Sequence, residues 1–292
     1  SYVLTGTDAA GNSASSAPVR FTKDSRPRRL FLSLVDEAFS PNGDGRKERA
    51  EVTTRVEPTD NTEVLSYLFA VEDRNGNRVY QQRRNGSIPA TLSWEGESNT
   101  GASSGRTATD GEYTAYLTAT FANGDVVRGE SEPLLLDTVA PRVEPETEYL
   151  LFSPNGDGRK DSFAVTHESS EEERWIATVS DDSGEEIAGR EWSGRAGTFS
   201  WDGRDRLGNV VEDGRYTYTV EATDAAGNRT RESLGPVRVD TAVVSAVVSF
   251  SGSGFSPNGD GYRDEIPLNL FASPNREIAE WDLTIRDEAG NL

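Results

Sequence analysis

Apolar and polar residues alternate over short segments along most of the chain, which is the pattern of β-strands with one buried face. In the first half of the chain this pattern predicts strands at 30–35, 50–56, 64–71, 78–82, 90–94, 113–121 and 134–137. Turn sequences rich in Asp, Asn and Gly separate these strands. No segment shows a convincing apolar period of 3.6 residues, and we interpret the charged run 168–174 as a solvated loop. The pattern therefore predicts an all-β protein.

One heptapeptide, Phe-Ser-Pro-Asn-Gly-Asp-Gly, occurs three times without change, at 39–45, 152–158 and 255–261. The copies lie a little over 100 residues apart, which is the size of one small domain. We therefore expect the last strands of one repeat, two complete repeats and the first part of another, at 1–24, 25–137, 138–240 and 241–292. Short strands at this density predict tandem immunoglobulin-like β-sandwich domains in an extended rod.

Further signatures recur at matching places, and we interpret them as structural. Thr-Asp-Ala-Ala-Gly-Asn occurs at 7–12 and 223–228 and predicts a hairpin turn between two late strands. One aromatic residue aligns between repeats and is expected in the core, namely Tyr67, Trp175 and Trp281. Trp-acid-Gly occurs at 94–96 and 201–203, where a strand-end aromatic is favoured over a sugar-binding platform. An Asp-Gly-x-Tyr sequence then follows, at Asp110 and at Asp213.

Composition narrows the chemistry that this chain of 292 residues can perform. It has no cysteine, which excludes disulfides, thiolate metal sites and a cysteine nucleophile. Its one histidine, His167, argues against a histidine zinc site or a catalytic triad. The net charge of −20 argues against nucleic-acid binding. No apolar run is long enough for direct membrane insertion, and the lack of a signal peptide suggests an excerpt from a longer protein.

These motifs resemble two families. The heptapeptide followed by an acid looks like the opening motif of bacterial gliding-motility C-terminal domains. Trp-Asp-Gly-Arg-Asp at 201–205, Gly208 and Asp-Gly-x-Tyr-x-Tyr at 213–218 resemble the Ig-like domain of the flagellar hook-capping protein. The first repeat departs from this pattern, because it has Glu95 and lacks the second Asp. Both resemblances imply a β-sandwich of secreted or envelope proteins, often in tandem and without enzymatic activity.

Calcium is the cofactor that the repeated loop could bind, because it prefers six to eight oxygen ligands. On the EF-hand pattern each copy offers an Asn, an Asp, a backbone carbonyl and an acid: Asn42, Asp44, Arg46 and Glu48; Asn155, Asp157, Arg159 and Asp161; Asn258, Asp260, Tyr262 and Asp264. The twelfth position fails in the later copies, where Ala164 and Pro267 stand, so each loop alone is an incomplete cage. A mechanical corner of tight turns with Phe as a core plug, or a partner-binding loop, remains open as an alternative.

The ends of the predicted repeats suggest how such a cage could be completed. Asp24, Asp137 and Asp240 lie at one fixed distance before the next repeated Phe, and no Gly/Ser run follows them, which predicts a short, stiff joint. In an Ig-like topology the loop would face the next domain, and the Asp-x-x-Gly turns that begin at Asp73 and Asp181 would lie at the same end. We therefore hypothesise an inter-domain calcium site formed by Asp44, Glu48, Asp73 and Asp137, and repeated by Asp157, Asp161, Asp181 and Asp240.

These observations predict a non-enzymatic stalk or fibre segment of a bacterial cell-surface or secreted protein, or of a periplasmic one, whose partners are neighbouring repeats of the same chain. The first alternative is an adhesin or carbohydrate-binding module that binds a surface glycan or protein receptor through Trp192 and Trp201. The second is a polymer subunit that assembles by strand donation. A hydrolase is disfavoured, because no cleft signature surrounds acid pairs such as Asp181-Asp182.

Overall fold

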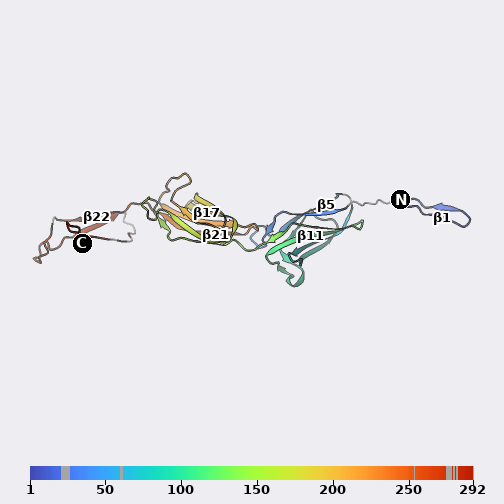
Figure 1. The fold of residues 1–292 in the computed structure, drawn as a ribbon, viewed down its shortest axis with the longest axis horizontal. Coiled ribbons are helices and arrows are strands. Elements are labelled where there is room, and N and C mark those ends of the chain that lie inside the picture. Colours follow the sequence, from blue (N-terminus) through green and yellow to red (C-terminus); the bar gives the residue numbers. More distant parts are fainter. Residues whose placement is uncertain are drawn as a thin grey trace. The chain divides into compact units, whose positions relative to one another are not determined.

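The structure of the chain is a computed structural model that describes residues 1–20, 27–59, 62–252, 254–273, 278, 280 and 282–291. These residues form β-strands and one short 3-10 helix, η1 (Gly101–Ser103) (Figure 1). The chain divides into two compact units. Unit 1 comprises Ser1–Arg142 with Ala222–Thr230, and unit 2 comprises Val143–Glu221 with Arg231–Leu292.

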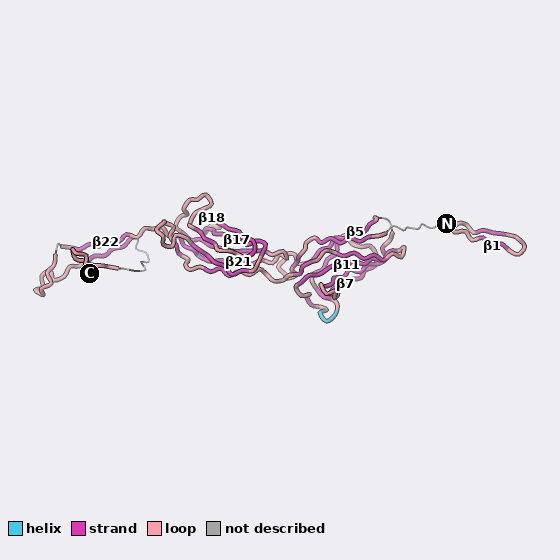
Figure 2. The backbone as a smooth tube through the Cα atoms, in the orientation of Figure 1, coloured by secondary structure: helices cyan, strands magenta, loops and turns pink. Residues whose placement is uncertain are grey.

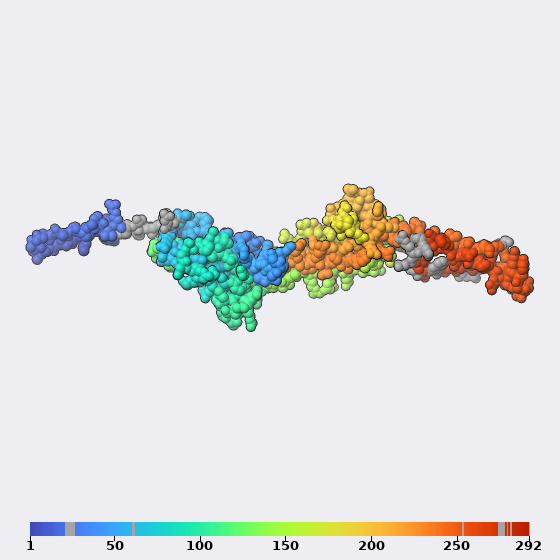
Figure 3. Space-filling view, turned by 180° about the vertical axis from the view of Figure 1, so that it is seen from behind, coloured from blue at the N-terminus to red at the C-terminus, as the bar shows by residue number. Residues whose placement is uncertain are grey.

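Most of unit 1 is a sandwich of two sheets over one core. The smaller sheet has the order β3 (Arg29–Leu34), β5 (Ala50–Glu57), β8 (Thr91–Trp94). The larger sheet has the order β4 (Ala38–Phe39), β13 (Leu134–Leu136), β11 (Gly111–Phe121), β6 (Val64–Asp73), β7 (Arg78–Asn85), and β12 (Val126–Glu130) also pairs with β11. Strands β9 (Glu97–Ser98) and β10 (Arg106–Thr107) pair with each other. Between them η1 lies at the tip of a projecting loop (Figure 2), and the space-filling view shows this part of the chain protruding from the surface (Figure 3).

The core follows from the alternation in the sequence. Along β11 every second side chain is buried, from Tyr113 through Leu117 to Phe121. These side chains belong to one apolar cluster with Leu32, Val52 and other residues of the smaller sheet. Burial of each large apolar side chain contributes roughly 1.5–3 kcal/mol, and this holds the two sheets face to face.

A second sandwich repeats this arrangement. Its smaller sheet has the order β14 (Val143–Glu146), β16 (Phe163–Ser169), β19 (Phe199–Trp201). Its larger sheet has the order β15 (Leu151–Phe152), β21 (Arg229–Val239), β20 (Gly214–Thr223), β17 (Glu172–Asp181), β18 (Glu186–Gly194). The turn that joins β20 to β21 is part of unit 1. In both sandwiches a three-stranded sheet faces a larger sheet, and the short first strand of the larger sheet pairs in parallel with the last strand of the sandwich.

Two hairpins complete the described chain. In unit 1, β1 (Thr5–Thr7) pairs with β2 (Ser13–Ser15), and every residue of this hairpin is exposed. In unit 2, β22 (Ser245–Phe250) pairs with β23 (Leu268–Ser273), as β3 pairs with β5 and β14 with β16.

The structure confirms the predicted fold class, because both sandwiches place their strands as immunoglobulin-like domains do. Turns 8–12 and 224–228 lie between paired strands, as predicted. The prediction of a solvated loop at 168–174 is wrong, since β16 runs to Ser169 and β17 begins at Glu172. Their charged side chains occupy strand positions that face solvent. The repeat boundaries and the rod remain predictions, and Asp24 and Trp281 lie outside the described residues.

Candidate functional site

The repeated heptapeptide and the three residues after it form a closed loop, found at 39–48, 152–161 and 255–264. In every copy the final carboxylate accepts hydrogen bonds from the N–H groups of both glycines. Glu48 accepts from Gly43 (2.9 Å) and Gly45 (2.7 Å). The same pair of bonds joins Asp161 to Gly156 and Gly158 (2.7 Å each), and Asp264 to Gly259 (2.9 Å) and Gly261 (2.8 Å).

The Asn and Asp of the loop form two successive turns. Asn42 Oδ1 accepts the Asp44 N–H (2.9 Å), and Asp44 Oδ1 accepts the Arg46 N–H (2.8 Å). Loops 152–161 and 255–264 repeat both bonds. Gly43 and Gly45 both have φ +84°, a left-handed conformation that glycine adopts without steric cost. The repeated sequence thus fixes the same local shape three times.

Phe39 and Pro41 anchor the first loop to the sandwich. Phe39 is fully buried, and its ring packs edge-on against Trp94, with 5.4 Å between ring centroids. A Cβ atom on Gly96 would lie 2.7 Å from Pro41 Cγ, so only glycine fits beneath the proline. Phe152, Trp201, Pro154 and Gly203 repeat the arrangement, with the corresponding distances 5.3 Å and 2.6 Å. The heptapeptide and the Trp-acid-Gly sequence are therefore two sides of one contact.

The Asp-Gly-x-Tyr signature supports the same end of each sandwich. Tyr113 packs on Trp94, with 4.9 Å between ring centroids, and its hydroxyl donates to the Thr109 carbonyl. Asp110 accepts hydrogen bonds from the N–H (3.1 Å) and the hydroxyl (2.9 Å) of Thr138. Tyr216, Trp201, Asp213 and Thr241 form the equivalent contacts. The sequence showed that Asp-Gly-x-Tyr is repeated, but not that its Asp contacts a Thr 28 residues further along the chain.

In unit 1 a turn is seated on loop 39–48. Asn42 Nδ2 donates to Asn228 Oδ1 (2.8 Å), and Asn228 Nδ2 donates to the Asp137 carbonyl (2.9 Å). Lys47 Nζ donates to the Ala225 carbonyl (3.0 Å) and pairs with Asp36 (2.9 Å). Asn228 is only 1% exposed. The repetition of Thr-Asp-Ala-Ala-Gly-Asn pointed to the turn, but no local pattern in the sequence indicates this contact.

The predicted calcium ligands of unit 1 lie at one end of the larger sheet. Asp73 pairs with Tyr113, and Gly111 and Phe39 both pair with Leu136, the residue before Asp137. Each carboxylate nevertheless has its own local donors. Asp73 accepts from the N–H groups of Asn75 and Asn77 (2.8 Å each), and Asp137 Oδ1 accepts from the Val139 N–H (2.9 Å).

The second set has a similar local arrangement. Asp181 accepts from the N–H groups of Ser183 and Glu185 (2.9 Å each), and Asp240 Oδ1 accepts from the Ala242 N–H (3.1 Å). Among the residues that the structure describes, no three His, Cys, Asp or Glu side chains are grouped so that they could hold a metal ion. Arg46, Arg159 and Tyr262 donate their N–H groups to the loop Asp, and nothing tests their predicted carbonyl role. The calcium ligand set stays a prediction.

Hydrogen-bond donors also favour the ionised form of several of these acids. The N–H groups of Gly259 and Gly261 lower the pKa of Asp264, and the N–H of Tyr262 lowers that of Asp260. The side chain of Asn77 lowers the pKa of Asp73, and the side chain of Ser183 lowers that of Asp181. These carboxylates therefore serve as hydrogen-bond acceptors that close turns.

One segment of the chain, which begins within loop 152–161, matches a family model. The family model of the FlgD Ig-like domain matches residues 153–226. The matched segment contains Trp201, Asp205, Gly208 and Tyr216, on which the predicted resemblance rested. The resemblance to gliding-motility domains stays a prediction. The search of curated proteins found no match.

Solved structures similar to the chain include tandem β-domains. The chain is 19% identical to a tetra-tandem repeat in the extending region of a large adhesion protein, covering 86% of this chain and 58% of that one, with a TM-score of 0.30. It is 14% identical to Clostridium thermocellum CbhA fibronectin(III)-like modules, covering 71% and 92%, with a TM-score of 0.38. It is 17% identical to a Ca²⁺-stabilised ice-binding adhesin of an Antarctic bacterium, covering 85% and 58%, with a TM-score of 0.34. The chain thus spans just over half the length of the two adhesin structures.

Residues 153–226 also contain the two aromatic residues proposed for a carbohydrate surface, Trp192 and Trp201. Trp201 is only 3% exposed, which supports the core interpretation. Trp192 is half-buried and lies 5.6 Å from the His167 ring, centroid to centroid. The aligned residues Tyr67 and Trp175 are buried, as expected for core positions.

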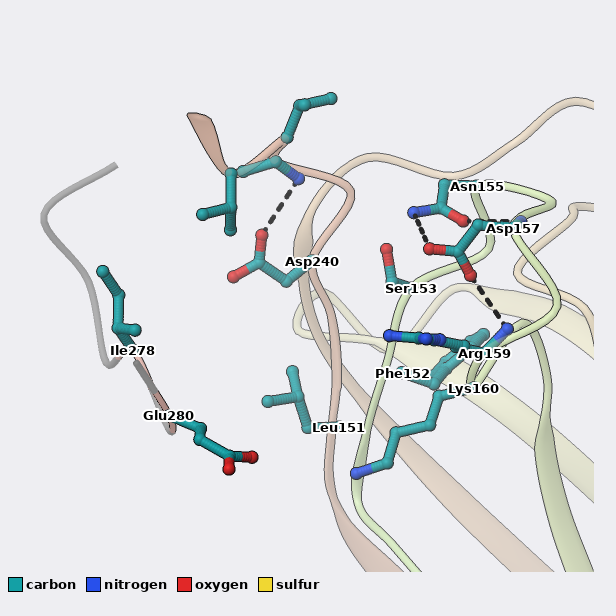
Figure 4. Close-up of a pocket in the computed structure, with 13 residues that line it drawn as sticks. Leu151, Phe152, Ser153, Asn155, Asp157, Arg159, Lys160, Asp240, Ile278 and Glu280 are labelled. Carbon is teal, nitrogen blue, oxygen red and sulfur yellow. Dashed lines mark hydrogen bonds between the residues drawn. The ribbon is translucent and has the colours of Figure 1, made fainter. Parts of the chain in front are cut away.

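A pocket of about 800 Å³ in unit 2 opens beside loop 152–161 (Figure 4). Ser153, Asn155 and Lys160 of the loop line it, together with Asp240 and the apolar Val243. Ile278 and Glu280 lie on the opposite side. This pocket places polar groups of the loop and of the Asp240 segment around one opening. Across the described ranges, no helix has the length and apolar character needed to cross a membrane.

Proposed function

We propose that this chain is a non-enzymatic structural segment of tandem repeats in a bacterial cell-surface or secreted protein. The observation that carries the proposal is the exact recurrence of one construction in two sandwiches: the same strand order, the same hydrogen-bonded loop and the same Phe, Pro and Trp anchor beneath it. Repetition of a whole sandwich with its end loop suits a chain whose task is to span distance.

Small-angle scattering of the full chain tests the extended arrangement. A single compact globule of this length would have a radius of gyration of about 19 Å. Tandem domains joined end to end should give a clearly larger value, with a pair-distance distribution that has a long tail. A value near that of the compact globule would refute the proposed stalk.

The cellular location of the protein tests this proposal more directly than a catalytic assay does. Antibodies raised against the sandwiches should label intact cells of the source bacterium, and mild protease treatment of those cells should remove the label. Labelling that requires cell lysis would contradict a surface location.

Calcium binding at the loops stays a prediction with a thermal test. An ion that binds the native loop but not the unfolded chain raises the melting temperature with increasing concentration. If Asp44, Glu48, Asp73 and Asp137 bind calcium, then chelation should lower the melting temperature and added calcium should restore it. Unchanged melting after chelation would favour the closed, hydrogen-bonded corner, in which Glu48 already accepts two N–H groups.

A further inference from the structure

Turns 8–12 and 224–228 have the same sequence and share the hydrogen bonds between their Asp and their Asn. In turn 8–12, Asp8 accepts from the N–H (2.8 Å) and the side-chain amide (2.9 Å) of Asn12. In turn 224–228, Asp224 accepts from the N–H (2.9 Å) and the side-chain amide (2.8 Å) of Asn228. The turn therefore has its shape before it contacts anything else, so it would lose little conformational freedom on docking.

The surroundings of the two turns differ. Ala226, Gly227 and Asn228 are buried where turn 224–228 is seated on loop 39–48, whereas all of turn 8–12 is exposed. Turn 8–12 thus presents in solution the surface by which its copy contacts a repeated loop.

Loop 152–161 carries the groups that hold the turn at loop 39–48. Asn155 occupies the place of Asn42, and Lys160 that of Lys47, with the same left-handed backbone (φ +50° and +42°). Asp240 occupies the place of Asp137. Its N–H donates to the Phe152 carbonyl (3.2 Å), as the Asp137 N–H donates to the Phe39 carbonyl (3.1 Å). These three groups line the pocket of unit 2 (Figure 4).

We propose that the pocket beside loop 152–161 binds turn 8–12 of a second copy of this chain. Asn155 Nδ2 would donate to Asn12 Oδ1, as Asn42 Nδ2 donates to Asn228 Oδ1, and Lys160 would donate to the Ala9 carbonyl. The contact joins different surfaces of the two copies, so repeated association is head-to-tail and leads to chains of molecules. It rests on the paired turns and loops and not on the proposed stalk function, whose scattering test is made at protein concentrations too low for this association.

The expected association is weak and depends on salt. A single turn buries far less surface than a stable interface, so a dissociation constant of about 1 mM is expected. Each copy carries a net charge of −20, and added salt screens the repulsion between copies. Association should therefore strengthen as the salt concentration rises, unlike an association held by attraction between opposite net charges.

Nuclear magnetic resonance of the ¹⁵N-labelled full chain, recorded over increasing protein concentration, tests the proposal. The amides of 155–159 and of 8–12 should shift together, while those of loop 39–48, which already holds a turn, should not. Asn12→Ala should abolish the shifts. Asn209→Ala is the matched control, because it removes the equivalent bond to Asp205 (3.1 Å) in another exposed turn, and it should leave the shifts unchanged.

A second variant, on the pocket side of the contact, distinguishes loss of the contact from an effect of Asn12→Ala on the hairpin itself. Lys160→Ala leaves turn 8–12 intact and should weaken the shifts severalfold. Shifts that survive Asn12→Ala, shifts of equal size in loop 39–48, or no concentration dependence in the unmodified chain up to about 2 mM would each overturn the proposal.

Discussion

Replacement of Asn228 by alanine should destabilise unit 1 well beyond the loss of one turn bond. The Asn228 side chain makes three hydrogen bonds, to Asp224 (2.8 Å), to the Asp137 carbonyl (2.9 Å) and from Asn42 (2.8 Å). Asn77 is the matched control in the same unit, because it is exposed and its side chain makes one such bond, to Asp73 (3.0 Å).

The two variants differ by the bonds to Asp137 and Asn42. At about 0.5–1.5 kcal/mol for each net hydrogen bond, Asn228→Ala should cost about 1–3 kcal/mol more than Asn77→Ala. Hydrogen exchange resolved by peptide, measured over a urea series, gives the free energy of opening for segments 39–48 and 222–230. If the two variants lose the same stability to within about 0.5 kcal/mol, then the contacts between turn 224–228 and loop 39–48 contribute nothing and the reasoning fails.

Three further predictions concern the loop and its neighbouring turn. Phe39→Ala should lower the free energy of unfolding in urea by about 3–5 kcal/mol, because Phe39 is fully buried. Phe255→Ala should lower it by less than about 1 kcal/mol, because Phe255 is 52% exposed. Equal losses would contradict the role of Phe39 as anchor. Glu48→Gln should speed amide exchange at Gly43 and Gly45 about fivefold, since one acceptor oxygen is lost, while Glu48→Asp should not, because Asp161 holds the same pair of N–H groups. Because the pKa of Asp73 is lowered, its turn bonds contribute stability at pH values above the ordinary aspartate pKa of about 3.9, and this stability is lost as the pH falls through the folded-state pKa. A ¹³C titration that places the pKa of the Asp73 carboxyl at or above the ordinary value would refute this.

Local patterns in the sequence predicted most strands and the turn character of the loop, because both depend on neighbouring residues. Strand β12 was not predicted. Its sequence contains Gly129, which weakens a strand pattern, and the structure shows why glycine stands there: a Cβ atom would lie 2.6 Å from the Leu30 carbonyl. The close approach of two segments that are distant in the sequence sets this requirement, so no local pattern reports it.

The contacts of the candidate site likewise fall into local ones, which the sequence can indicate, and long-range ones, which it cannot. The side-chain hydrogen bonds within loop 39–48 join residues no more than five apart. The two turns closed by Asn42 and Asp44 agree with the alternative of a corner of tight turns, whereas the bonds from the glycines to Glu48 were not predicted. The contact between Asn42 and Asn228 joins residues 186 apart. The sequence could show that both segments are repeated, but only the fold could show that they meet.

The three loops separate what the heptapeptide does locally from what it does in the fold. Phe39 and Phe152 are buried and Phe255 is exposed, yet all three loops keep both glycine bonds to the final acid. Asn, Gly, Asp and the acid therefore suffice for the shape of the loop, whereas Phe and Pro attach that shape to a sandwich. A loop that is rigid before it is attached can present the same donors at the end of every repeat, and this is the property that recognition of a preformed Asp-Ala-Ala-Gly-Asn turn requires.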